Sequence, residues 1–262
     1  MTFESIDMVM DDGLARVTLN QAEQGNPFNA TLCREWLELA NALASERTLR
    51  AILITARGKY FSVGGDIRMF TRNLDVLPER IREWTGTLHA GIARIARLDA
   101  PTVVAVHGVA MGGAVGLVAS CDLVYASGSA SFGAAYPSIG YSCDAGSSKA
   151  LASRMGVSRG KRFLLCNETL DVSAAADCGL VDFVVDAEAL QADAEAAARR
   201  FANGPTQAYG DIRRLFSNVM QQSLEAQLED EAQSLARMAG TEDAREGILA
   251  FSEKRRPTFK GR

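Results

Sequence analysis

Two pairs of glycine residues, each between a strand-like apolar run and a helix-like run, are the stretches best suited to chemistry. The first pair is Gly64-Gly65, within residues 61–67, and the second is Gly112-Gly113. A strand that turns through glycine into a helix leaves backbone N–H groups without partners, and these suit an oxygen that carries negative charge. If the two turns converge, we expect each to offer one N–H group to a single oxygen.

A loop and a helix supply the polar side chains that could face such an oxygen. Asp144 ends the loop and precedes a predicted helix, so its carboxylate can cap that helix and still face a pocket. Tyr136 can line the same pocket, or pack as an aromatic with its hydroxyl satisfied elsewhere. His89 lies within a predicted helix, where a lone histidine is typical of a satisfied core or surface group. Cys143 has no base paired with it in the sequence, so we do not expect a nucleophile there.

Short apolar strands alternate with helices along most of the chain, which predicts an α/β core. The expected strands are residues 3–9, 14–19, 51–55, 103–106, 122–126, 131–133 and 180–185. The expected helices are residues 29–45, capped by Asn29 or Thr31, then 67–72, 79–98, 114–120, 144–155, 159–165 and 173–178. Asp66 can cap the second of these helices, and residues 73–78 are expected to form a loop.

The composition shifts near residue 187, and almost everything from there to 239 reads as helix rich in Ala, Glu, Gln and Arg. A helical tail that cannot bury its apolar stripe alone usually packs on a neighbour. The sequence therefore predicts a core at residues 1–200 and a helical region at 201–262 that mediates oligomerisation.

The net charge of −4 gives no general electrostatic case for binding nucleic acid. No apolar run approaches the ~20 residues of a membrane span, and the acidic start of the chain does not resemble a signal peptide. The five cysteines lack metal-binding spacing, which predicts reduced thiols, no metal site and a cytoplasmic location. Basic clusters at 154–162 and 254–260 could meet a phosphorylated small molecule.

Four stretches together resemble the crotonase, or enoyl-CoA hydratase/isomerase, superfamily over almost the full length. They are residues 61–67, 101–122, 132–140 and 253–260. The resemblance implies a spiral of ββα units at 1–200 and C-terminal helices that build trimers, often paired into hexamers. It also implies an acyl-CoA thioester as the partner, with coenzyme A as part of the substrate and no permanently bound cofactor.

The resemblance also implies roles for individual residues. By position, the N–H groups of Gly65 and Gly113 form an oxyanion hole for the thioester carbonyl. The other residues implied in substrate binding are Val63, Asp66, Ile67, Gly112, Gly116, Tyr136 and Lys260. The resemblance implies that the basic tail with Lys260 lies near the CoA phosphates, on the same or a neighbouring subunit.

Two departures from the hydratase pattern direct the functional prediction. Gly116 and Tyr136 stand where the hydratases of this family carry catalytic glutamates, so hydration is not expected. Asp144 stands where the Δ3,Δ2-enoyl-CoA isomerases and the phenylacetate-pathway ring-epoxide isomerase carry a catalytic aspartate. We therefore expect Asp144 to move a double bond by carrying a proton from C2 to C4, in a pocket that Gly116 and Tyr136 leave apolar and roomy.

Other functions remain open at this point. His89 and Asp144 match positions used by the 4-chlorobenzoyl-CoA dehalogenase of this superfamily, in which the aspartate attacks an aryl carbon and the histidine activates water. Tyr136 departs from that enzyme's tryptophan. An acyl-CoA hydrolase with Asp144 as nucleophile and a non-catalytic acyl-CoA-binding scaffold are the further alternatives.

Overall fold

A six-stranded sheet forms the centre of the protein, whose computed structural model describes residues 3–262. The strand order is β1-β2-β3-β4-β6-β9, and only β1 and β2 pair antiparallel. The strands are β1 (Ile6–Asp11), β2 (Leu14–Leu19), β3 (Ala51–Ala56), β4 (Thr102–Val106), β6 (Leu123–Ser127) and β9 (Phe183–Val185). The parallel strands β3, β4 and β6 read as near-continuous apolar runs because helices cover both faces.

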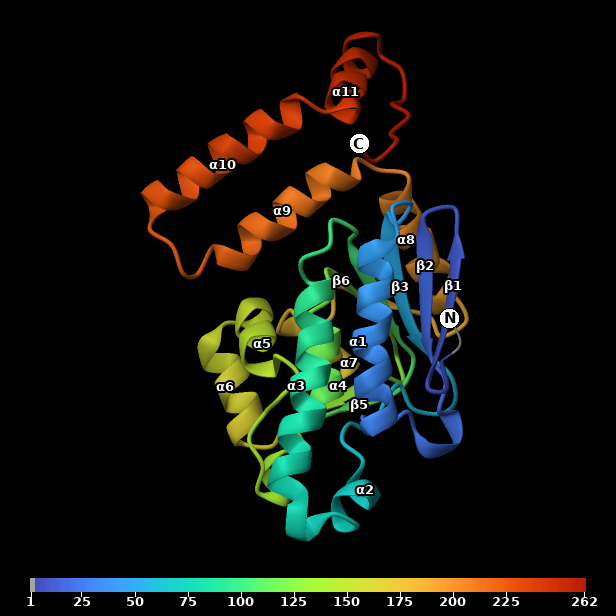
Figure 1. Cartoon of the computed structure of the whole chain (residues 1–262), viewed down its shortest axis with the longest axis vertical. Helices are drawn as coiled ribbons and strands as arrows, with labels where there is room; N and C mark the ends of the chain where they lie inside the picture. The colour runs from blue at the N-terminus through green and yellow to red at the C-terminus, as the bar shows by residue number, and fades with distance from the viewer. Residues whose placement is uncertain (1–2) are drawn as a thin grey trace.

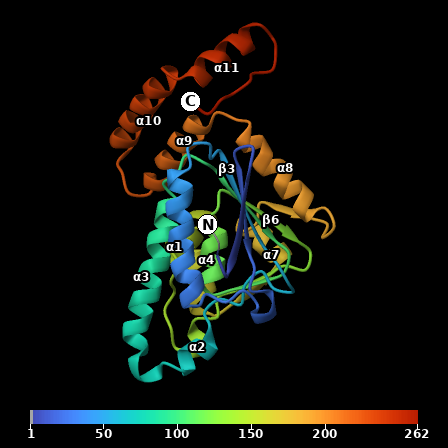
Figure 2. The same ribbon diagram turned by 45° about the vertical axis from the view of Figure 1, so that its right-hand side comes forward.

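Each face of this sheet has its own core. On one face Leu53, Val103 and Tyr125 pack with α8 (Leu190–Ala202). On the other face Ile54 and Val104 pack with the larger core, which contains side chains of α1 (Ala30–Ser45), α3 (Leu77–Ile95) and α4 (Gly113–Ala119). Figures 1 and 2 show α1 and α3 side by side along this second face.

A smaller sheet stands beside the main one. It consists of β5 (Val109–Met111), β7 (Ser131–Gly133) and β8 (Thr169–Asp171), in that order. Strand β5 follows β4 after only two residues, so the chain leaves one sheet and enters the other just before the Gly112-Gly113 turn.

The remaining helices surround these sheets. They are α2 (Ile67–Thr71), α5 (Ser147–Met155), α6 (Val157–Leu165), α7 (Val172–Asp177), α9 (Thr206–Asn218), α10 (Leu224–Ala239) and α11 (Glu242–Ser252), with short 3-10 helices η1 (Ala22–Gln24), η2 (Leu74–Val76) and η3 (Pro137–Ile139). Helices α9, α10 and α11 lie at one end of the molecule and α2 at the other (Figure 1). The predicted division near residue 200 falls within α8 and stays a prediction.

Local signals placed several helices correctly. Asn29 caps α1, because its side chain accepts a hydrogen bond from the N–H group of Leu32 at 2.9 Å. Asp66 caps α2 in the same way, accepting from Met69 at 3.0 Å. Both caps confirm the sequence-based expectation.

Several predicted boundaries were wrong. Residues 73–78 are not a loop: η2 occupies part of them, and α3 starts at Leu77, where Pro78 suits a first turn that needs no N–H partner. The first strand covers Ile6–Asp11 rather than 3–9, and β9 is shorter than the expected 180–185. The helix expected from residue 144 starts at Ser147, with Gly146 at its N-cap, so Asp144 does not cap it.

The chain beyond α11 folds back along that helix. The carboxylate of Asp243 accepts the backbone N–H groups of Lys260 and Gly261 at 2.6 and 2.7 Å. Within residues 3–262 no helix is both long enough and apolar enough to cross a membrane.

Candidate active site

The two glycine turns converge. The N–H group of Ser62 donates to the carbonyl of Val109 at 3.1 Å, and Met111 donates to the carbonyl of Ser62 at 3.0 Å. Gly64 has a φ of 78°, and a Cβ atom there would lie 2.5 Å from the Met111 oxygen. Only glycine fits this backbone conformation and this close approach, which explains the first glycine pair.

Buried polar groups that the sequence analysis did not single out hold the first turn. The Asn26 side-chain amide donates to the carbonyls of Arg57, Tyr60 and Phe61 at 2.9 to 3.1 Å. The Ser62 hydroxyl donates to the Asn26 carbonyl at 2.7 Å. A sequence signal existed, because asparagine tolerates the left-handed conformation that Asn26 adopts at a φ of 52°.

The N–H groups of Gly65 and Gly113 are available to a ligand. Neither donates a hydrogen bond to any acceptor among residues 3–262. Gly65 follows the first turn, Gly113 is the first residue of α4, and both line one cavity. Two such donors could stabilise negative charge on one oxygen, and this role stays a prediction.

The Asp144 carboxylate lies beside Gly113. A Cβ atom at Gly113 would lie 3.0 Å from Asp144 Oδ1 and 3.2 Å from the Phe28 ring. The Tyr136 hydroxyl donates to the same Oδ1 at 2.7 Å and lies 3.2 Å from the Ser147 hydroxyl. Acid, glycine and phenol therefore meet in one place, although they come from different parts of the chain.

Burial in and around this cluster raises the pKa values of two groups, the Tyr136 hydroxyl and the Cys33 thiol. Burial, reinforced by the negative charge of Asp144, raises the pKa of the Tyr136 hydroxyl well above its ordinary value, so the hydroxyl keeps its proton and acts as a donor. Burial and the same charge raise the pKa of the Cys33 thiol to about 12. Cys33 lines the cavity as a neutral thiol and is a poor nucleophile there.

His89 contacts the backbone next to Asp144. Its Nε2 atom accepts the N–H group of Ala145 at 2.9 Å. An imidazole nitrogen that accepts carries no proton, so the proton of the neutral ring lies on Nδ1. Ala145 has a φ of 51°, which costs a non-glycine residue free energy, and the bond from His89 helps to hold it.

A cavity of about 690 Å³ contains most of the predicted site residues. Those that line it are Val63, Gly65, Ile67, His89, Gly112, Gly113, Tyr136 and Asp144. An aromatic stack that the sequence analysis missed lines it too: Phe70 lies 6.4 Å from Trp84 and 5.8 Å from Tyr141 between ring centroids. The aromatic residues come from α2, α3 and the loop before α5, so no single helical pattern could predict the stack.

The other predicted site residues lie elsewhere. The Asp66 carboxylate is used as the cap of α2. Gly116 is buried in α4, where a Cβ atom would overlap the Ser147 hydroxyl and lie 2.9 Å from the Ala145 carbonyl. The expectation that Gly116 leaves the pocket roomy is wrong, because Ser147 fills that space. Lys260 pairs with Glu242 at 3.4 Å, in the tail that folds along α11.

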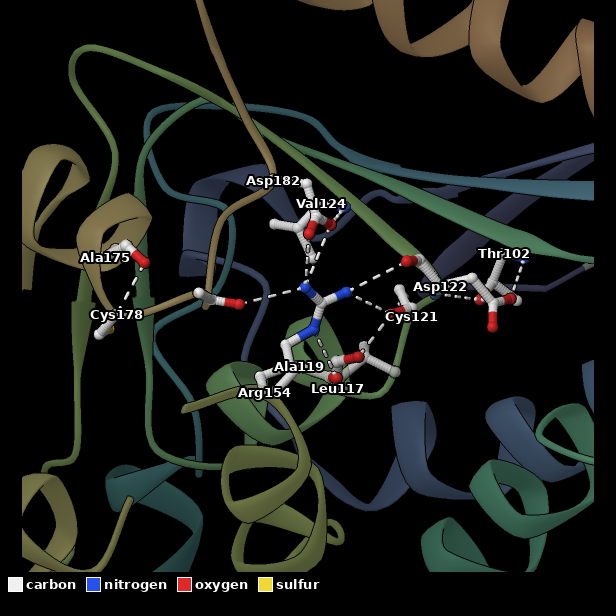
Figure 3. Close-up of polar contacts among 11 residues, drawn as sticks. Thr102, Leu117, Ala119, Cys121, Asp122, Val124, Arg154, Ala175, Cys178 and Asp182 are labelled. Carbon is white, nitrogen blue, oxygen red and sulfur yellow. Dashed lines mark hydrogen bonds and ion pairs between the residues drawn. The ribbon is translucent and has the colours of Figure 1, made fainter. Parts of the chain in front are cut away.

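Most cations of the two basic clusters form ion pairs within the chain. Arg154 donates to the Ala119 and Cys121 carbonyls at 3.0 and 2.6 Å and pairs with Asp182 at 3.1 Å (Figure 3). The other pairs are Arg159 and Arg162 with Glu168, and Arg255 with Glu246. These ion pairs give most of the clustered cations a structural role.

Two converging glycine turns over a largely apolar cavity, on a mixed α/β core with C-terminal helices, are the features expected of the crotonase type. The model of the Enoyl-CoA hydratase/isomerase family matches residues 10–262. The chain belongs to the enoyl-CoA hydratase/isomerase family, which confirms both the predicted superfamily and the predicted α/β fold.

Relatives of similar identity carry the names of different reactions. The chain is 30% identical to trans-2-decenoyl-[acyl-carrier-protein] isomerase of Streptococcus mutans, over 100% of both chains. It is 30% identical to 4-chlorobenzoyl coenzyme A dehalogenase-2 of Arthrobacter sp., over 93% of this chain and 88% of the relative. The crystal structure of an enoyl-CoA hydratase from Polaromonas sp. JS666 superposes with a TM-score of 0.91 at 27% identity, covering 97% of this chain and 99% of the other. Sequence identity alone does not distinguish among these reactions, so the geometry of the site has to be used.

Proposed function

We propose that this protein is an enoyl-CoA isomerase that converts 3-enoyl-CoA thioesters to 2-enoyl-CoA thioesters through an enolate. The observation that carries the proposal is the position of Asp144 Oδ1 against Gly113, beside two backbone N–H groups that have no partner within residues 3–262. This arrangement offers a base and a site for developing negative charge to the same ligand.

In the proposed reaction the thioester carbonyl lies between the N–H groups of Gly65 and Gly113. The Asp144 carboxylate removes a proton from C2, and the electrons move into the carbonyl to form a dienolate. The two N–H groups stabilise that charge, and removing one such donor elsewhere costs ~2.7–4 kcal/mol of transition-state stabilisation. Asp144 then returns the proton to C4, so the base is regenerated and only the double bond has moved.

One carboxylate suffices for this reaction, whereas hydration needs groups that hold a water molecule and move its proton. Tyr136 and Gly116 occupy the positions that the resemblance assigns to the hydratase glutamates, and Ser147 fills the space beside Gly116. The name of the Streptococcus mutans relative, an isomerase of an acyl thioester, supports the same reaction class.

A dehalogenase or hydrolase with Asp144 as nucleophile is the second candidate, because a relative carries the dehalogenase name and His89 contacts the backbone N–H group of Ala145, the residue after Asp144. For that reaction His89 would have to accept a proton from water. Its Nε2 atom already accepts from Ala145, which favours isomerisation. Trapping of a covalent aryl-Asp144 intermediate would favour the dehalogenase instead. A non-catalytic scaffold would bind acyl-CoA and turn over none of these thioesters.

The proposal also includes the cofactor requirement and the cellular location of the enzyme. Coenzyme A enters as part of the substrate, and the proton transfer needs no additional cofactor. All five cysteines are free thiols, which supports a reducing, cytoplasmic location.

Asp144→Asn tests the proposal. We expect the conversion of 3-enoyl-CoA to fall on the order of 10²- to 10⁴-fold, because the amide cannot accept the proton. Binding of the thioester, measured by calorimetry, should persist. Asp177→Asn, an exposed acid at the end of α7, is the matched control and should convert at the wild-type rate. Wild-type conversion by Asp144→Asn would refute Asp144 as the base.

A further inference from the structure

We propose that Tyr136 is a positioning residue that holds the Asp144 carboxylate in the orientation in which it acts as the base. This inference rests on the proposed isomerase function and adds a second residue to its machinery. Tyr136 stands at the position of a hydratase glutamate, and its hydroxyl keeps its proton and donates a hydrogen bond to the Asp144 carboxylate.

The hydrogen bonds assign different tasks to the two carboxylate oxygens. Oδ1 accepts the Tyr136 hydroxyl at 2.7 Å, while Oδ2 accepts no hydrogen bond within residues 3–262. Tyr136 is the one hydrogen-bond donor to this side chain in that range. A bond at Oδ1 fixes the rotation of the carboxylate and leaves Oδ2 as the oxygen that takes the substrate proton.

Ser147 holds the phenol in turn. Its hydroxyl lies 3.2 Å from the Tyr136 hydroxyl, and its backbone N–H donates to the Asp144 carbonyl at 2.9 Å. Ser147 is 1% exposed, and only the missing side chain of Gly116 leaves room for its hydroxyl. The two departures from the hydratase pattern therefore belong together, because the glycine admits the serine and the serine supports the phenol.

The backbone around this network is unusual for its residue types. Ala135 and Ala145 adopt φ values of 61° and 51°. These alanines flank Tyr136 and Asp144, and positive φ at alanine costs free energy that the surrounding contacts must offset. Backbone strain of this kind, next to both members of a hydrogen-bonded pair, is typical of a functional site.

The other titratable groups near the carboxylate do not replace the phenol. Cys33 on α1 lies close enough for the Asp144 charge to reach it and stays a neutral thiol. His89 on α3 accepts from the neighbouring backbone rather than donating to the acid. Cys143, the preceding residue, lines the cavity. A substitution of Tyr136 should therefore directly change the hydrogen bonding of the Asp144 carboxylate.

Tyr136→Phe removes the donor and keeps the ring. Because the lost bond favours the charged carboxylate, the titration midpoint of Asp144 should move to higher pH, and the acidic limb of the kcat profile should move with it. We expect kcat to fall roughly tenfold or more, since hydrogen bonds to charged groups are the stronger ones, while KM changes little.

The first measurement is a carbon-13 NMR titration of aspartate-labelled protein, in which the Asp144 signal is the one that Asp144→Asn removes. It needs no turnover, so it tests the inference even if 3-enoyl-CoA is not converted. Failure of the wild type to isomerise would defeat the proposed function alone. Tyr125→Phe, at a buried tyrosine in the opposite core, is the control and should leave the midpoint and kcat unchanged.

An unchanged midpoint in folded Tyr136→Phe would overturn the inference. If that variant does not fold, 3-fluorotyrosine placed at position 136 decides the matter. The fluorinated phenol is a stronger donor, so the midpoint should move to lower pH, opposite to the shift from Phe. A group with only a packing role would move the midpoint in neither experiment.

Discussion

At the scale of single residues, Gly113 faces two side chains that matter for the proposed chemistry. A Cβ atom there would lie 3.0 Å from Asp144 Oδ1 and 3.2 Å from the Phe28 ring, so one of these neighbours must shift. Gly65 differs, because its added Cβ atom would meet only the far edge of the Phe70 ring. A side chain should therefore be tolerated better at Gly65 than at Gly113, the two positions of the proposed oxyanion hole.

Gly113→Ala should lower kcat for 3-enoyl-CoA by up to about 10²-fold, because the added Cβ atom displaces the Asp144 carboxylate or the Phe28 ring by a fraction of an ångström, and a misplacement of ~1 Å at reacting groups costs about that much. Gly128→Ala is the control, since a Cβ atom at Gly128 would meet nothing within 4 Å. Steady-state kinetics on both purified variants makes the comparison. Equal activity of Gly113→Ala and the wild type would mean that Asp144 and Gly113 do not act on the same ligand.

At the scale of elements, Arg154 fixes α5 against α4. Its guanidinium reaches from the end of α5 to the carbonyl of Ala119 at the end of α4, and to Cys121 and Asp182 beyond it (Figure 3). At their other ends the same two helices begin at Gly113 and just after Asp144. These contacts of Arg154, which we call the Arg154 clamp, therefore help to fix the position of the proposed base relative to the proposed oxyanion hole.

Arg154→Ala should lower the free energy of unfolding by roughly 1.5–3 kcal/mol, because it removes charged hydrogen bonds to the Ala119 and Cys121 carbonyls and the ion pair with Asp182. Arg162→Ala, at an exposed ion pair on α6, should cost less than about 1 kcal/mol. Urea unfolding of both variants measures the difference. Similar losses in the two would show that the clamp contributes no more than a surface pair.

At the scale of the whole molecule, the C-terminal helices expose large apolar side chains. Phe216 on α9 and Leu224, Leu228 and Leu235 on α10 are 54–74% exposed. Exposed large apolar side chains that gather on neighbouring helices are typical of an interface. Together with the family membership, this supports the proposal that a second and third copy of the chain cover these helices.

A Phe216→Asp/Leu228→Asp double variant should therefore dissociate the oligomer. We expect light scattering to give a trimer or hexamer for the wild type and a smaller species for the variant, because a charge buried in an apolar interface is costly. Val9→Asp, at an apolar residue of β1 that is 57% exposed, is the control and should keep the wild-type mass. A monomeric wild type would refute the proposed assembly.

The sequence by itself determined the features that depend on neighbours along the chain. Alternating strands and helices, the caps at Asn29 and Asp66, and the buried face of α1 all follow from local spacing. The glycine turns follow as well, because positive φ at Gly64 and Gly112 is a property of single residues. Boundaries around η2 and Ser147 were missed, because contacts with distant segments extend or shorten an element beyond its local pattern.

Only the tertiary structure decided how distant segments meet. It brings the Asp144 carboxylate to Gly113 and to the Tyr136 hydroxyl, and it fills the space beside Gly116 with Ser147. It also pairs most cations of the basic clusters with acids of the same chain, although the sequence alone allowed these cations to meet a phosphorylated small molecule. The physical reason is that such contacts depend on the relative position of packed elements, and packing is settled by the whole core rather than by any one stretch of residues.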